Sequence, residues 1–344
     1  MTSPEDNNTI PTSLDTIKQF LSRHRWLLIV ALATLAIRAC YLYELSLQFG
    51  FRVPMVDEKW HWEWANNILN DSFWGEGAYF RAPLYPYLLA LLSWITSGSI
   101  FFAKLLQSVL ASGTAIFVYL MANKLFNRTT AIVAGLAYAC YGTLVFYETM
   151  FLIPALFLFL LTWGMYRLIS RSESTLMRTW LVTGLIFGLA AIARPNILLV
   201  VPFLMIWQFL RSCSASSLVT RLKLPAILLV GTLAAVAPVT VRNAIVTGDF
   251  MLISSQGGIN LHLGNNAYAN GLSMIMPEVE LDESVSWRQF GVVTRVAAER
   301  EAGREMSEAE LSAFWTKKAV NFIISNPGKF ASLVWKKSVY LVSG

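Results

Sequence analysis

Residues 26–47 read WLLIVALATLAIRACYLYELSL and directly follow the basic residues Arg23, His24 and Arg25. A membrane-spanning helix needs about 20 mostly apolar residues, so this run is long enough to cross the hydrocarbon layer. It is also too long for the core of a cleaved signal peptide, and it has no small-residue cleavage site. We therefore expect a retained membrane anchor, preceded by a cytoplasmic N-terminal segment at 1–25.

The composition of the whole chain agrees with a lipid environment. Of the 344 residues, 56% are hydrophobic and only 14% are charged, which is more apolar than a soluble domain of this length. The net charge is +6, but the basic residues form short clusters between apolar runs, so we expect membrane lipids and no nucleic acid as partners. Cys40, Cys140 and Cys213 lie too far apart for a disulfide framework or a Cys-x-x-Cys metal site.

The apolar runs after the first outward loop (48–99) predict six further spans. The basic loops between them then fall on the same side as the basic N-terminus, as topology requires. The fold class is therefore an all-α integral membrane protein, with a seven-span module at 26–243. The spans are expected at about 100–121, 130–147, 150–169, 179–193, 196–211 and 224–243.

The segments outside these spans hold most of the charged and aromatic residues. In the first outward loop, 57–71 is predicted to be a helix on the membrane surface, and 83–96 is too short to span. Residues 244–328 form a second outward region, with a charged helical stretch near 285–324. Residues 329–344 are the start of a further apolar helix, which leaves open a fragment of a longer protein or a frayed tail.

An acid pair, Asp57-Glu58, lies in the first outward loop where a helix should begin. A carboxylate there can accept a proton from an incoming hydroxyl group. Adjacent helical residues point about 100° apart, so only one of the two should face a given site. We favour Asp57 as the base and Glu58 as a structural partner; an aspartate that only caps the helix is the alternative.

A second acid, Glu148, stands between two predicted spans among apolar and aromatic residues. An ionisable group at that depth suggests a function, such as positioning a donor, binding a metal or neutralising an arginine, whereas an interface residue that reaches water is the alternative. Arg81, Arg194 and Arg242 also fall on the outer side, where guanidinium groups suit phosphate oxygens. Snorkelling alone would explain a lone arginine there.

The segment SSQGGINLHLGNN at 254–266 is rich in glycine and in side chains that form hydrogen bonds. Asn260, His262, Asn265 and Asn266 are therefore candidates for binding the hydroxyl groups of a sugar or an acceptor. An ordinary turn cluster is the alternative. Because the chain has only three histidines, it cannot build a His-based metal cluster.

These features occur in an order that resembles a known family. They are Asp57-Glu58, the segment FRAPLYP at 80–86, Glu148, Arg194-Pro195-Asn196, and Pro238 through Asn243 leading to Gly264-Asn265-Asn266. Over about residues 26–270 the chain resembles the GT-C superfamily of membrane glycosyltransferases, especially bacterial relatives of protein O-mannosyltransferases and of the lipid A aminoarabinose transferase.

The resemblance implies an outward active site and a polyprenyl-phosphate sugar as donor. It also implies that Asp57 is the essential first-loop aspartate, acting as the base of an inverting transfer. Some relatives use a divalent metal ion and others do not, so the resemblance leaves the metal and the role of Glu148 open. The chain departs from the family in its length, because relatives usually carry further C-terminal spans.

We therefore expect a glycosyltransferase in the cytoplasmic (inner) membrane, with its active site facing the periplasm or the cell exterior. It would move a sugar from a polyprenyl-phosphate carrier to a hydroxyl group of a lipid, a glycan or a protein. A transporter or flippase would need ionisable groups near mid-membrane, and a non-catalytic membrane subunit is the third possibility. The enzyme hypothesis places Asp57, Glu148 and the outer arginines in one wet pocket.

Overall fold

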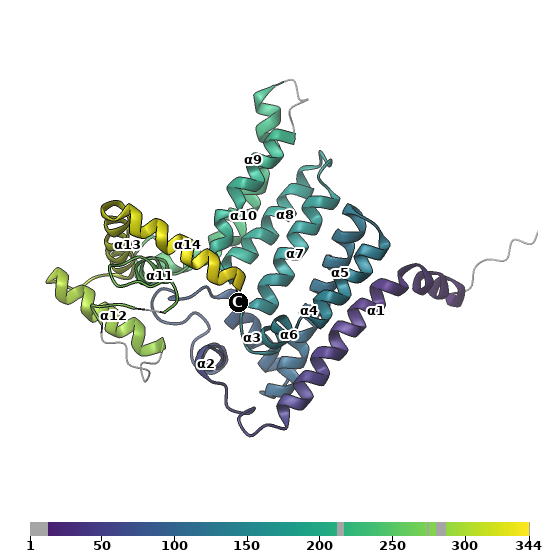
Figure 1. The fold of residues 1–344 in the computed structure, drawn as a ribbon, viewed down its shortest axis with the longest axis horizontal. Helices are drawn as coiled ribbons and strands as arrows, with labels where there is room; N and C mark the ends of the chain where they lie inside the picture. Colours follow the sequence, from purple (N-terminus) through teal and green to yellow (C-terminus); the bar gives the residue numbers. More distant parts are fainter. Residues whose placement is uncertain (1–12, 212–216, 274, 280–286, 344) are drawn as a thin grey trace, which may run out of the picture.

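A computed structural model describes residues 13–211, 217–273, 275–279 and 287–343 (Figure 1). Every regular element in these ranges is a helix, which confirms the all-α fold class. Residues 1–12, Cys213 and the start of the stretch predicted near 285 lie outside the described residues. The elements are α1 (Ser13–Ser46), α2 (Val56–Asn70), α3 (Leu84–Ile95), α4 (Ile100–Leu125), α5 (Arg128–Cys140), α6 (Gly142–Thr149), α7 (Pro154–Ser170), α8 (Met177–Ala193), η1 (Pro195–Leu199), α9 (Val201–Arg211), α10 (Leu218–Thr247), α11 (Gln256–Gly264), α12 (Trp287–Ala302), α13 (Glu308–Ser325) and α14 (Pro327–Ser343).

Three helices among the described residues are long and apolar enough to cross a membrane. They are His24–Ser46 within α1, Ile100–Leu125 and Leu218–Thr247. A fourth span is obtained if α5 and α6, which are bent by 58° at a break, count as one. Helices α7, α8 and the η1–α9 pair are apolar but shorter. The chain is thus a multi-pass membrane protein, and the total of seven spans stays a prediction.

The region predicted as one span at 130–147 is two helices. The break falls at Tyr141, whose backbone is extended (φ −71°, ψ 101°), so α5 ends at Cys140 and α6 starts at Gly142. An extended residue cannot continue the ladder of backbone hydrogen bonds, and the chain therefore turns there. The consequence is that Glu148 lies on a short separate helix and not at the end of a long span.

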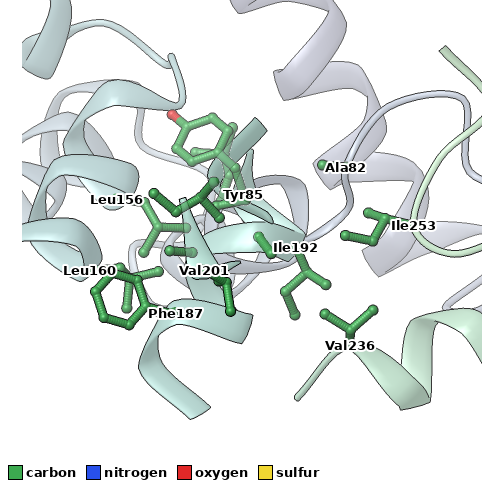
Figure 2. Packing of buried hydrophobic residues seen from close by; sticks show 14 of the residues in the cluster. Ala82, Tyr85, Leu156, Leu160, Phe187, Ile192, Val201, Val236 and Ile253 are labelled. Carbon is green, nitrogen blue, oxygen red and sulfur yellow. The ribbon is translucent and has the colours of Figure 1, made fainter. Parts of the chain in front are cut away.

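The shorter helices are held by packing against their neighbours. Helix α8 buries most of its length against α7 and α10. A Cβ atom on Gly184 of α8 would lie only 2.1 Å from the carbonyl oxygen of Leu228 in α10, so these two backbones approach as closely as glycine permits. Figure 2 shows Tyr85, Phe187 and Val236, from α3, α8 and α10, converging in the core that results.

The two ends of the bundle differ in chemistry. At one end, Lys124 and Arg167 stand near the ends of α4 and α7 and share a hollow. At the other end lie the short helices α2, α3 and α6, with α11–α13 grouped beside them (Figure 1). Helices α11–α13 have a hydrophobic core of their own around Trp315. The region predicted as an outward loop is therefore a small packed unit.

Candidate active site at the α2 end of the bundle

Asp57 lies in the first turn of α2, where the positive end of the helix dipole stabilises a carboxylate. Its Oδ1 accepts a hydrogen bond from Nη1 of Arg81 at 3.1 Å. The Asp57 side chain is 42% exposed and that of Arg81 only 10%. Arg81 also stacks 4.7 Å above the ring of Trp60, so the arginine is fixed from two sides while the carboxylate stays open to water.

Val56, directly before Asp57, has a φ of +50°. A β-branched residue rarely adopts this left-handed conformation, and the strain costs about 1–3 kcal/mol. Strain of this kind persists where the surrounding structure imposes it, and it is frequent at functional sites. The start of α2 thus carries a strained backbone residue directly before Asp57.

Glu58 points in a different direction from Asp57. Its Oε1 lies 2.8 Å from Nζ of Lys104 in α4 and accepts a hydrogen bond of 2.7 Å from the backbone N–H of Phe151. The exposed fractions of the Glu58 and Lys104 side chains are 16% and 3%. Glu58 therefore ties α2 to α4 and to the segment before α7.

Glu148 is fully buried, and the expectation that it faces a wet pocket is wrong. Its Oε2 receives hydrogen bonds from Arg38 at 2.6 and 2.9 Å, and its Oε1 accepts one from the hydroxyl of Tyr138. Neither Arg38 nor Glu148 is exposed to solvent. The physical reason is that a carboxylate among apolar side chains needs a cation close by, and α1 supplies one directly.

The networks of Glu58 and Glu148 nevertheless adjoin. Gln107 of α4 donates hydrogen bonds to the backbone oxygens of Glu148 and Met150, at 2.9 and 2.6 Å, and it accepts one from the hydroxyl of Tyr85. Phe151, which bonds Glu58, follows Met150 directly. Asp57, Glu58 and Glu148 therefore lie at the same end of the bundle, and Asp57 is the most exposed of the three.

The two remaining outer arginines have different environments. Arg242 is buried, and it donates hydrogen bonds to the backbone oxygens of Trp74, Gly75 and Gly77, so its guanidinium group fastens the loop between α2 and α3. Arg194 is exposed at the end of α8, 5.8 Å from the ring of Phe157. It forms no ion pair with any carboxylate of the described residues.

The segment at 254–266, expected as a loop that binds sugar or acceptor hydroxyl groups, contains the helix α11 with its C-terminal cap. The amide groups of Asn265 and Asn266 donate hydrogen bonds to nearby backbone oxygens, which leaves them a structural part in the turn. His262 is buried, lies 3.1 Å from Glu278 and stacks on the ring of Trp315. Of the four residues, only Asn260 is exposed.

Two hollows lie beside α2 and share Trp60 and Phe80 as a common wall. The first, of about 430 Å³, is lined further by Glu63, Trp64 and Arg242. The second, of about 260 Å³, lies between this wall and the α11–α13 unit. Trp60 follows Asp57 by three residues, so the two side chains share a face of α2. Asp57 thus stands one turn from both hollows.

Within the described ranges, no group of three or more His, Cys, Asp and Glu side chains lies close enough together to hold a metal ion. Each of the three acids singled out in the sequence has a cationic side chain as neighbour: Arg81 for Asp57, Lys104 for Glu58 and Arg38 for Glu148.

Sequence reasoning missed Arg38, Lys104 and Gln107, although a signal was present. Each is a charged or strongly polar residue inside an otherwise apolar helix, and such residues are uncommon unless they are paired or functional. A search for intramembrane charges would have found Arg38 and Lys104. Such a search would not have shown that Arg38 pairs with Glu148 and Lys104 with Glu58.

His61 is the residue through which pH should act on this end of the bundle. It is buried between α2 and the ring of Tyr85, outside the predicted spans. Burial, which disfavours the charged ring, and to a lesser extent the nearby charge of Arg81 together lower the pKa of His61 from 6.5 to about 3. The unfolded chain therefore binds a proton below pH 6.5 that the folded protein does not bind.

We expect this difference to reduce the free energy of unfolding by about 2 kcal/mol between pH 7 and pH 5. The loss continues as the pH falls towards the folded pKa, and carboxylates contribute little in this window. His61→Gln should remove this slope in thermal unfolding of the detergent-solubilised protein, whereas Asn70→Gln in the same helix should keep it. An unchanged slope in His61→Gln would contradict the assignment.

Comparison with known proteins gives a family match for part of the chain. The family model for dolichyl-phosphate-mannose-protein mannosyltransferases matches residues 81–241, which run from Arg81 through α3 to near the end of α10. No curated protein matches the chain. The matched segment includes Arg81, Glu148 and Arg194 and covers just under half of the chain. Over this segment the chain is similar to the dolichyl-phosphate-mannose-protein mannosyltransferase family, and this similarity, with the helical membrane fold, supports a membrane glycosyltransferase of the GT-C type.

Proposed function

We propose that this protein transfers a sugar from a polyprenyl-phosphate carrier to a hydroxyl acceptor, with inversion, and that Asp57 is the base. The observation that carries the proposal is the exposure of Asp57. Of the three acids singled out in the sequence, Asp57, Glu58 and Glu148, it has by far the most exposed side chain, at 42% against 16% and 0%. It is also held by Arg81 one turn from two hollows.

The proposed reaction needs one proton acceptor and a site for a departing phosphate. Asp57 takes the proton of the acceptor hydroxyl as the oxygen bonds to the anomeric carbon, and the bond between that carbon and the phosphate oxygen breaks. The carrier phosphate leaves with added negative charge, which a guanidinium group can stabilise. Arg194 is the best candidate for this part, because Arg242 holds a loop and Arg81 holds Asp57.

The aromatic walls of the two hollows suit carbohydrate. Trp60 and Phe80 stand between them, with Trp64 and Tyr79 in the larger hollow and Trp315 in the smaller one. The smaller hollow also contains Ser255, whose buried hydroxyl has no hydrogen-bond partner within the described residues. We place the donor sugar in the larger hollow and the acceptor in the smaller one, so that Trp60 and Asp57 lie between them.

Glu148 has a different part in this proposal. It holds α6 to α1 through Arg38 and thereby positions Met150 and Phe151, which in turn contact Gln107 and Glu58. We therefore propose Glu148 and Glu58 as positioning residues, and Asp57 as the one of these three acids that touches the substrate.

The direct test is turnover with a lipid-linked donor. The protein in lipid nanodiscs, given a radiolabelled polyprenyl-phosphate hexose or pentose and an extract of envelope lipids and glycans, should release free polyprenyl phosphate and label an acceptor. A nucleotide sugar without the lipid carrier should give no product. Binding of the lipid-linked sugar without turnover over all acceptors would support a non-catalytic subunit and contradict the proposal.

A further inference from the structure

The end of the bundle opposite α2 carries a hollow that the proposed reaction does not use. It has a volume of about 500 Å³ and lies between the C-terminal ends of α4 and α7. Lys124 comes from the last turn of α4, Arg167 from the last turn of α7, and Arg171 caps α7. The rings of Trp163 and Tyr166 complete its wall.

The positive charge of this hollow has no counterion in the described part of the chain. None of Lys124, Arg167 and Arg171 forms an ion pair with a carboxylate there, whereas Asp57, Glu58 and Glu148 each lie beside a cation. The Nε atom of Arg167 is buried without a hydrogen-bond partner among the described residues, and its Nη2 only reaches the backbone oxygen of Thr179 at 3.4 Å. Three cations that converge without an acid repel one another, and an anion between them removes this cost.

The usual excess of basic residues in the loops on one side of a membrane explains why cations occur at this end. It does not explain why three of them, from two helices, line one hollow. The position also fits lipid: α4 is long enough to cross the membrane, so its last turn lies at the level of the headgroups. Tryptophan and tyrosine prefer that level, and basic pockets between spanning helices suit anionic headgroups.

We propose that this hollow binds the headgroup of an anionic phospholipid from the leaflet opposite the proposed active site. The phosphate lies between Arg167, Arg171 and Lys124, and the acyl chains follow the apolar face near Leu120. A zwitterionic lipid is excluded by charge, because its own cation would meet three others. The proposal rests on membrane insertion only and stands whether or not the chain transfers sugar.

The experiment compares two triple variants of equal charge. The first, Lys124→Gln/Arg167→Gln/Arg171→Gln, removes the cations of the hollow. The second, Arg128→Gln/Arg178→Gln/Lys223→Gln, removes three exposed cations near the same end of the bundle that do not line the hollow. Each protein is titrated in detergent with phosphatidylglycerol, phosphatidylcholine or inorganic phosphate, and bound lipid is counted by native mass spectrometry while thermal unfolding is followed.

We expect the unchanged protein to retain phosphatidylglycerol and to unfold several degrees higher with it, with no such effect of phosphatidylcholine. The hollow variant should bind phosphatidylglycerol at least tenfold more weakly, and the control variant should stay within twofold of the unchanged protein. If both variants lost phosphatidylglycerol binding equally, the binding would depend only on the overall charge of this end of the bundle, and the proposal would be overturned. Equal stabilisation by inorganic phosphate alone would assign the hollow to a free anion and not to a lipid, and would overturn the proposal.

A single variant serves if the triple variant does not fold. Arg171→Gln, which alters an exposed side chain, should still weaken binding of phosphatidylglycerol severalfold, and unchanged binding would overturn the proposal.

Discussion

Asp57→Asn should lower the rate of sugar transfer at least a hundredfold while the protein remains folded and inserted. A general base contributes about 10²- to 10⁴-fold to such a reaction, and an amide of the same shape cannot accept the proton. The substitution also weakens the contact with Arg81, but half-exposed ion pairs contribute only about 1 kcal/mol or less. The expected loss is therefore in turnover and much smaller in stability.

The measurement is the transfer rate with a radiolabelled polyprenyl-phosphate sugar, next to binding of the same donor. Donor binding should change little in Asp57→Asn, because the proposed base acts on the acceptor. Glu44→Gln is the matched control, since Glu44 is an exposed carboxylate in the last turns of α1, towards the α2 end of the bundle. Full transfer activity in Asp57→Asn would remove the proposed base, and an equal loss in Glu44→Gln would show that the effect is not specific.

Glu148→Gln should destabilise the protein by about 3–5 kcal/mol. The change leaves the guanidinium group of Arg38 fully buried without a compensating charge, and burying an unpaired charge costs about this much. Replacing both partners, as Arg38→Met/Glu148→Leu, should recover most of the stability, because an apolar pair of similar volume has no charge to compensate. The measurement is unfolding of the protein in detergent micelles.

The control for this pair is the exposed ion pair of α2. Lys59 and Glu63 are 3.8 Å apart with side chains 62% and 47% exposed, so Glu63→Gln should change stability by no more than about 0.5 kcal/mol. The double variant also separates two roles of Glu148. If Glu148 is structural, the double variant keeps transfer activity per folded molecule; a double variant that is stable but inactive would instead assign Glu148 to the reaction.

The family match does not by itself explain why Asp57, Glu58 and Glu148 have different roles. The matched segment starts at Arg81, so Asp57 and Glu58 lie before it. Their environments are nevertheless fixed by residues within the segment, namely Arg81 for Asp57 and Lys104 for Glu58. The part of the chain that carries the family likeness therefore builds the surroundings of the proposed base.

The sequence by itself determined the membrane character, the helical fold, and the helix that begins at the Asp57-Glu58 pair. These properties depend on contiguous residues: the length of an apolar run, the residues that start a helix, and the shortness of a stretch such as α3. The same local signals identified Asp57, Glu148 and the outer arginines as the charged residues that needed an explanation.

Only the tertiary structure decided which cation each acid meets and which acid reaches water. Arg38 and Glu148 are 110 positions apart, and nothing in the residues around either one names the other. Likewise, nothing in the sequence shows that the side-chain amides of Asn265 and Asn266 are engaged, but in the fold both donate hydrogen bonds to backbone oxygens near α11. The physical reason is that hydropathy and helix propensity act over a few residues, whereas burial and charge pairing are set by which distant helices pack together.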